Sequence, residues 1–272
     1  MENNFVNSDM LLDLIEFSVL KSTKKKNLKT SAVAEGITKT IVKLAEKNEY
    51  NKPAGEYITF DVATEDANIK SLIENMSKEL IRLSKNHKSI LIIGIGNDIL
   101  VSDSLGPTVV KKLDIDGTSK IKMYKLCPNV VGNTGIDSTT IIKSVIDIVK
   151  PDLIIAVDSL ASRNFSRVGR SFQISTGGIV PGSGSGKKNP EELSIGTLGV
   201  PVIAIGVPIV VHVKSFIYEC LDGLTGDENL WAIINSLPKI NMLNGVIMAP
   251  KEVDYIVDNC SKIIATAIDS LL

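Results

Sequence analysis

Residues 89–97 read SILIIGIGN, an apolar run that ends in glycines and an amide. Leu153–Val157 (LIIAV) and Pro201–Ile205 (PVIAI) are two further runs of the same kind. Short uninterrupted runs of β-branched and aliphatic residues are typical of strands that are covered on both faces, as in parallel sheets. The three runs predict the centre of a parallel sheet, with its first strand over Ser89–Ile93, and Ile121–Leu126 is expected to join it.

Helical patterns lie between these strands. They cover Asn68–Ser84, Gly106–Lys112, Asp137–Val149 and Lys251–Leu272, and Asp137 is expected to act as a cap. Strands that alternate with helices at these spacings indicate an α/β fold with one doubly wound, mostly parallel sheet and helices on both faces. Phe172–Ser175 is expected to be a short edge strand.

The first part of the chain has a weaker pattern. It is expected to hold a helix over Asp9–Leu20, a lysine-rich linker over Lys21–Lys29 and a second helix over Ala32–Glu46. Tyr57–Val62 alternates with period two and predicts a strand. We therefore divide the chain into an N-terminal segment, residues 1–54, and one α/β catalytic domain, residues 55–272. The N-terminal segment is expected to pack more loosely than the core and is a candidate pro-segment.

The composition excludes several classes of protein. The 272 residues carry 30 Lys and Arg against 31 Asp and Glu, a balance that excludes a basic coat of nucleic acid. The 3 cysteines show no CxxC spacing, which argues against a disulfide framework and a zinc knuckle. The start lacks the features of a signal peptide, and Val200–Val213, the most apolar stretch, is too short to span a bilayer. We expect a soluble, cytoplasmic protein with no membrane partner and no direct contact with nucleic acid.

Two aspartates follow apolar runs, near the points where the strands are expected to end. Asp103 and Asp158 are each followed by Ser-Leu, and the carboxyl ends of parallel strands meet at one crevice. Two carboxylates at one crevice share a proton, because like charges raise the pKa of one and leave the other ionised. The alternative is that each aspartate caps the N-terminus of a helix. Periodicity alone does not decide between the two.

Three other features are less specific. Gly94-Ile-Gly96 departs from a dinucleotide fingerprint because Ile99 stands where the third glycine belongs. Pro181–Lys188 departs from a phosphate-binding loop at both ends, and as a glycine-rich loop it suits a substrate-binding edge. His212 follows the third apolar run, where it is either a packed core residue or a metal ligand or proton carrier.

Several of these strings, taken in order, resemble the germination protease family of spore-forming bacteria. They are Gly94–Asn97, Asp103–Pro107, Pro128–Ile136, Lys150–Arg163, Gln173–Ser175, Gly178–Lys187, Thr197–Pro208 and Ala249–Asp254. The resemblance covers roughly residues 55–272. It implies a zymogen that assembles as a homotetramer and shares its α/β core with hydrogenase maturation endopeptidases.

The resemblance also implies an activity. Family members are endopeptidases that initiate the degradation of small acid-soluble spore proteins in the spore core during germination. They are described as atypical aspartic proteases, and their two aspartates correspond to Asp103 and Asp158. The residues then expected to bind the substrate or the oxyanion through backbone N–H groups are Gly94, Gly96, Asn97, Gly182, Gly184 and Gly186. Arg163 and Lys187 are expected to supply positive charge for Glu-containing substrates.

Departures from the family pattern keep two alternatives open. The N-terminal Arg-Thr-Asp-Leu-Ala motif is not evident, and the sequence between Cys220 and Pro250 is shorter than in the family. These departures favour a spore protein that keeps the fold and binds a partner without proteolysis. In place of Val-Val-His212, the family pattern has Val-Val-Asp, so a histidine stands here where the family has an aspartate. No cofactor is expected of a two-aspartate site, whereas His212 with Asp103 and Asp158 would form the metal site of a maturation-type peptidase.

Overall fold

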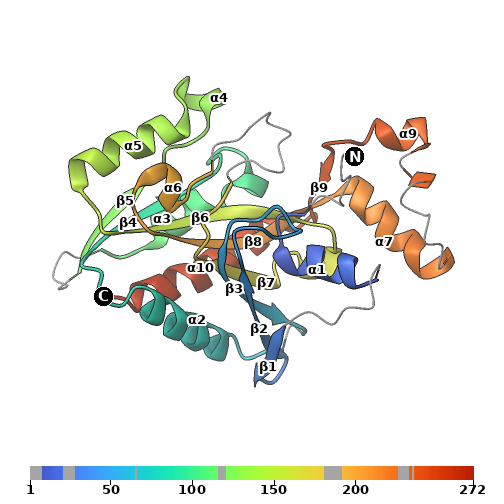
Figure 1. Cartoon of the computed structure of the whole chain (residues 1–272), viewed down its shortest axis with the longest axis horizontal. Coiled ribbons are helices and arrows are strands. Elements are labelled where there is room, and N and C mark those ends of the chain that lie inside the picture. Colours follow the sequence, from blue (N-terminus) through green and yellow to red (C-terminus); the bar gives the residue numbers. More distant parts are fainter. Residues whose placement is uncertain are drawn as a thin grey trace.

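The computed structural model describes residues 8–20, 28–64, 66–115, 121–180, 192–225, 233–234 and 236–272. Within these ranges the strands lie side by side in one sheet through the middle of the molecule, in the order β1-β2-β3-β7-β8-β6-β4-β5, with β9 beside β8 (Figure 1). The strands are β1 Lys29–Ala34, β2 Ile37–Leu44, β3 Gly55–Val62, β4 Ser89–Gly94, β5 Lys122–Leu126, β6 Leu153–Ser162, β7 Ser171–Ser175, β8 Val202–His212 and β9 Ile247–Met248. The helices are α1 Leu11–Leu20, α2 Ile69–Leu83, α3 Leu105–Lys112, α4 Val131–Thr134, α5 Ser138–Val149, α6 Ile195–Leu198, α7 Val213–Thr225, α9 Pro238–Asn241 and α10 Val253–Asp269.

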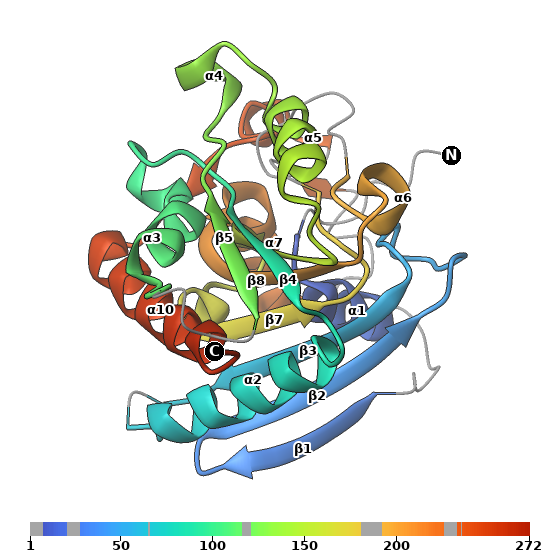
Figure 2. The same ribbon diagram turned by 90° about the vertical axis from the view of Figure 1, so that its left-hand side faces the viewer.

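The strands β5, β4, β6 and β8 run parallel, as predicted. Successive residues of β4 point to opposite faces of the sheet. Ile90 and Ile92 join the apolar cluster that contains residues of α2, α3 and α10, whereas Leu91 and Ile93 join the cluster that contains Ile142 of α5. Figure 2 shows these helices on the two sides of the sheet. The α/β fold with helices on both faces is therefore confirmed.

The other half of the sheet, from β7 through β3 and β2 to β1, is antiparallel. The sheet is thus mixed, where the sequence predicted a mostly parallel one. The prediction that Phe172–Ser175 is an edge strand is wrong. β7 pairs with both β3 and β8, and all of its residues are buried. The short length of a strand carries no information about its neighbours, which is why this position was not predicted.

The predicted helix over Ala32–Glu46 is also wrong. These residues lie mainly in the hairpin of β1 and β2, which turns at Gly36 with a positive φ of 69°. Ile37, Thr40 and Val42 of β2 are buried, and the strand pairs antiparallel with β1 on one side and β3 on the other. Residues 37–42 are rich in β-branched side chains, which restrict helical rotamers and pack well on a pleated surface.

The strands β6 and β8 are longer than predicted. The sequence predicted that they end at Val157 and Ile205, but they continue to Ser162 and His212. Asp158 therefore lies inside a strand, so its alternative role as a helix cap is wrong. The four predicted helices are confirmed as α2, α3, α5 and α10, and Asp137 caps α5 by accepting a hydrogen bond from Thr139 N at 2.9 Å. In the described ranges, no helix combines the length and apolar character needed to cross a bilayer.

The N-terminal residues 8–15 pack tightly, so the expectation of looser packing is wrong for them. Leu11 and Ile15 of α1 form an apolar cluster with Val42 and Tyr57 of the sheet. The side chain of Asp13 is fully buried. Asp13 can be buried because its carboxylate pairs with Arg167. The sequence did not predict this burial, because the alternation of charged and apolar residues in α1 resembles that of a surface helix. Because β2 pairs with β3 along its whole length, residues 1–54 and 55–272 share one sheet.

The Asp13 carboxylate accepts hydrogen bonds from four donors. They are Ser8 Oγ at 2.6 Å, Ser162 Oγ at 2.7 Å, Arg163 N at 2.9 Å and the Arg167 guanidinium. Arg167 also contacts Glu16, whose side chain is half exposed, with Nη2 to Oε1 at 2.6 Å. Residues of α1 are thus joined to β6 and to the turn after it by a buried ionic network.

We expect Asp13→Ala to lower the free energy of unfolding by about 3 kcal/mol or more, because it leaves a buried cation and buried donors without their shared acceptor. The matched control is Glu16→Ala, which removes the exposed partner of the same guanidinium and is expected to cost less than about 1 kcal/mol. Urea unfolding at neutral pH measures both variants. Equal losses would contradict a special role for the buried carboxylate.

Candidate active site

Asp103 is held by the loop between β4 and α3, at the end of a short 3₁₀ helix, Val101–Asp103. Asn97 N donates a hydrogen bond to Asp103 Oδ2 at 2.9 Å, so the loop closes on itself around the carboxylate. This closure depends on Gly96, which has a φ of 118°, and whose added Cβ would lie 2.0 Å from the Asp103 carbonyl oxygen. A side chain at this position would therefore displace Asp103. Asp103 does not cap α3, because the N-cap position is Ser104.

Close backbone contact brings this loop against β6. A Cβ on Gly94 would lie 2.4 Å from the Gly106 carbonyl oxygen, and a Cβ on Gly106 would lie 2.4 Å from the Val157 carbonyl oxygen. The start of α3 therefore packs directly on the ends of β4 and β6. Gly94 and Gly96, predicted to bind substrate through their backbone, are both buried and serve this packing.

Asp158 is the first residue of β6 beyond the end of β4. The pairing of β4 with β6 ends at Gly94 opposite Val157, and Ile95 N then donates to Val157 O at 2.8 Å. On its other side Asp158 pairs with Gly206 of β8. Its carboxylate Oδ1 accepts a hydrogen bond from Ser159 N at 2.8 Å. Asp158 thus lies inside β6 and next to the carboxyl end of the neighbouring strand β4.

The two carboxylates differ in burial and in the direction of their pKa shifts. Burial raises the pKa of Asp158 well above its usual value, and the charges of Asp103 and Asp9 raise it further. Burial also raises the pKa of Asp103, but the hydrogen bond from Asn97 opposes that change. Asp158 is almost fully buried, whereas Asp103 is partly exposed. Of the two, Asp158 is therefore the one whose protonated form is more strongly favoured.

His212 ends β8 and is buried. Burial lowers its pKa, and the negative charge of Asp9 opposes this change. Across the part of the chain that the structure describes, no group of three His, Cys, Asp or Glu side chains is arranged to hold one metal ion. His212 therefore does not join Asp103 and Asp158 in the three-residue metal site that the sequence left open.

Arg163 is oriented into the protein. Its guanidinium binds the Glu219 carboxylate of α7 and lies 5.8 Å from the centre of the Tyr218 ring. Its side chain is buried, so its charge is neutralised internally rather than offered to a substrate. The remaining predicted substrate-binding residues, Gly182, Gly184, Gly186 and Lys187, lie outside the described residues.

Sequence reasoning missed an amide network that braces the Asp103 loop. Asn133 Nδ2 donates to Asn97 Oδ1 and to Asn129 Oδ1, both at 2.8 Å. Asn129 Nδ2 donates to Asp98 Oδ1 at 2.7 Å. The sequence could have indicated this network, because Asn129 and Asn133 follow a predicted strand at a spacing of four residues, which places them on one face of the turn that follows β5.

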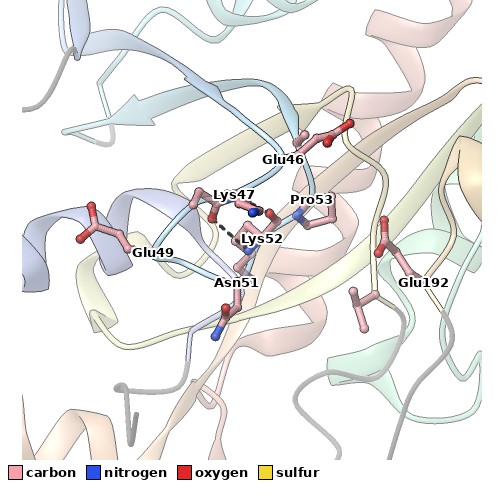
Figure 3. A pocket seen from close by; sticks show the side chains of 10 residues that line it. Glu46, Lys47, Glu49, Asn51, Lys52, Pro53 and Glu192 are labelled. Carbon is pink, nitrogen blue, oxygen red and sulfur yellow. Dashed lines mark hydrogen bonds between the residues drawn. The ribbon is translucent and has the colours of Figure 1, made fainter.

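Sequence reasoning also missed Lys52, which lies between two cavities. A small pocket over the sheet, beside the Asp158 position, is lined by Lys52, Asp9, Tyr57, Gln173 and Gly206 among others. A wider cleft of about 800 Å³ lies between residues 46–54 and the segments ending at Val180 and starting at Glu192. Figure 3 shows Glu192 across this cleft from Lys47 and Lys52. Lys52, Pro53 and Val180 line both cavities, so the cleft adjoins the pocket.

Comparison with known proteins agrees with these motifs. A family model described as Germination protease matches residues 12–229. The Germination protease of Clostridium tetani is 36% identical, with 82% of this chain and 80% of the relative covered. That of Caldanaerobacter subterraneus subsp. tengcongensis is 34% identical, with 88% and 85% covered. Among solved structures, the NiFe hydrogenase maturation protease HycI from Thermococcus kodakarensis KOD1 is similar over 70% of this chain and 98% of its own, at 15% identity and a TM-score of 0.36.

The family match reaches further toward the N-terminus than the expected start at residue 55, and it takes in most of α1. It also spans both aspartates, the glycines that pack beneath them and the asparagines that brace their loop. The resemblance first seen in short motifs thus extends over most of the chain, and the chain belongs to the germination protease family.

Proposed function

We propose that this protein is an endopeptidase that initiates the degradation of small acid-soluble spore proteins in the spore core, with Asp103 and Asp158 as its catalytic pair. Membership of the germination protease family supports a protease of spore germination. The observation that carries the two-aspartate mechanism is that both aspartates lie beyond the end of β4: Asp103 is in the loop that follows β4, and Asp158 is the next residue of β6 after the pairing with β4 ends. The raised pKa of Asp158 agrees with this placement. The zymogen form and the homotetramer implied by the family resemblance belong to this proposal.

In the proposed mechanism the two aspartates have different roles. Asp158 is the aspartate that retains its proton more strongly, because burial and the nearby charge of Asp103 both disfavour its ionised form. Asp103, ionised and partly exposed, takes a proton from a water molecule as that water attacks the scissile carbonyl carbon. Asp158 donates its proton to the carbonyl oxygen, which gives a tetrahedral intermediate with two hydroxyl groups. Asp103 then protonates the amine nitrogen as the C–N bond breaks, and one hydroxyl of the intermediate returns a proton to Asp158 as the carboxylic acid forms.

The cleft beside Lys52 supports substrate binding. Its volume of about 800 Å³ lies within the range of about 300–1,000 Å³ that is common for ligand pockets. Val180 and Glu192, which flank the Gly182–Lys187 stretch, both line it. The substrate-binding role that the sequence predicts for Gly182–Lys187 stays a proposal. The charged lining of the cleft is mixed, with Lys47 and Lys52 beside Glu46, Glu49 and Glu192, and burial lowers the pKa of Lys52. Arg163 does not add positive charge there, because it is paired with Glu219.

We expect Asp103→Asn and Asp158→Asn to fold normally and to lose cleavage by roughly 10⁴-fold, the scale seen when an essential catalytic carboxylate becomes an amide. The matched control, Asp147→Asn, changes an exposed carboxylate on α5 and should leave the rate unchanged. Cleavage of a purified small acid-soluble spore protein and thermal melting are measured together. Near-normal cleavage by either site variant would refute the catalytic assignment.

The raised pKa of Asp158 also predicts how stability depends on pH. A raised folded-state pKa means that the folded protein binds this proton more tightly than the unfolded chain, so stability falls as pH rises from the unfolded pKa of 3.8 to the folded pKa. Asp158→Asn has no such proton. Its stability relative to the original protein should therefore increase with pH, at up to about 1.4 kcal/mol per pH unit in that window. Urea unfolding of both proteins across acidic to neutral pH measures the difference, and a constant difference would contradict a buried, protonated Asp158.

A further inference from the structure

One edge of β6 loses its neighbouring strand just where Asp158 begins. In a parallel strand, alternate residues direct both N–H and C=O toward the same neighbour. Val157 directs these groups toward β4, since its carbonyl oxygen accepts from Ile95 N at 2.8 Å. Ser159 and Ala161 share that direction, but β4 has already ended at Gly94. The β6 edge, meaning the backbone of Ser159–Ala161 on this side, therefore needs other partners.

Part of the β6 edge is occupied by the chain's own N-terminal segment. Asp9 N donates to Ala161 O at 2.8 Å, and Ala161 N donates to Asp9 Oδ2 at 2.9 Å. The side chain of Asp9 thus takes the place of the backbone carbonyl that an added strand would present to the Ala161 N–H. Ser159 N is bound by the carboxylate of Asp158 itself. The groups of β6 next to the proposed catalytic residue are thus held by local substitutes for a strand.

On the side away from β6, other residues bind the backbone of the same N-terminal segment. Lys52 Nζ donates to Asp9 O at 3.1 Å, and Leu11 N donates to Gln173 Oε1 at 3.0 Å. Most of these hydrogen bonds use backbone atoms of the bound segment, while the side chains of Met10 and Leu11 are fully buried and add apolar contacts. Lys52 and Gln173 also line the pocket beside Asp158. An extended peptide of another sequence can make the same backbone hydrogen bonds.

We propose that the β6 edge, with Lys52 and Gln173 facing it, binds the main chain of an extended polypeptide substrate as an added strand, and that Ser8–Leu11 fill this site in the free protein. The inference rests on the proposed protease function and adds to it the site where the substrate backbone binds. Addition of a strand to a free sheet edge is a common mode of peptide recognition. Since substrate and internal segment use the same Ala161 groups, they compete.

Two variants of the full-length chain test the β6 edge and the N-terminal segment that occupies it independently. Asp9→Ala removes the occupant's side-chain contact and leaves the β6 edge intact. Ala161→Pro removes the edge N–H itself, and because this N–H faces away from β8, pairing of β6 with β8 is retained. Both carry Asp103→Asn, which blocks cleavage. The probe is a fluorescent peptide copied from Ser8–Glu16, and binding is measured by anisotropy.

We expect hydrogen exchange to rise in residues 8–11 of both variants, since each loses the contact between Asp9 and Ala161. Asp9→Ala should then bind the peptide about tenfold more tightly than its parent, while Ala161→Pro should bind no more tightly than the parent, because a backbone hydrogen bond is worth about tenfold in affinity. An unlabelled small acid-soluble spore protein should displace the peptide. Asp147→Ala, the matched control, should bind like the parent.

Equal gains in affinity for both variants, or no gain for Asp9→Ala, would overturn the proposal. Thermal melting and hydrogen exchange in β8 establish that Ala161→Pro is folded, and Asp9→Ala tests the site independently if it is not. The readout needs no catalysis, so the two proposals fail separately. Expected peptide binding without any cleavage, either by the unmodified protein or after limited proteolysis of its N-terminal segment, refutes the protease function and leaves the β6 edge as a peptide site. Normal cleavage with unchanged peptide binding refutes the edge site alone.

Discussion

The strand β4 ends at Gly94, while β6 beside it and β8 on the far side of β6 continue, and the rest of the site depends on this difference in length. The early end of β4 leaves a step in the sheet, because beyond Val157 the backbone groups of β6 that face away from β8 have no neighbouring strand. A buried backbone group without a partner is costly, so the step has to be filled. Two segments fill it: the loop carrying Asp103, with α3 packed on β6 at Gly106, and the N-terminal residues that bind Ala161.

The same step explains why a carboxylate pair can exist inside this fold. Desolvation of an ionised carboxylate is unfavourable, and a nearby like charge adds to the cost. Retaining a proton on Asp158 lowers that cost, and the hydrogen bond from Asn97 stabilises the charge on Asp103. The neighbouring arginines do not neutralise the pair, because Arg163 binds Glu219 and Arg167 binds Asp13. These two arginines are thus paired with other carboxylates, and the pKa values of both aspartates are raised.

Apolar runs predicted where the strands of the parallel half begin, and where β4 and β5 end to within one residue, but not where β6 and β8 end. Asp158 and Pro208 resemble the polar and helix-starting residues that follow a strand, yet β6 and β8 continue through them. They do so because a strand's end is decided by its neighbours: β6 and β8 pair with each other after β4 has stopped. The charged helix α1 was predicted, but its burial was not, since the partners of Asp13 lie far along the chain. Asp103 and Asp158 were predicted because each directly follows an apolar strand or its loop.

The distance along the chain between the N-terminal segment and its partners has a consequence for synthesis on the ribosome. Ser162, which binds Asp13, lies 149 residues after it. At typical synthesis rates of about 5–20 residues per second, α1 waits roughly 10–30 s before β6 exists to receive it. Its apolar face is exposed to chaperones and proteases for that time. When β6 does form, Ser8–Leu11 are already present, so the edge next to Asp158 is covered as soon as it is made.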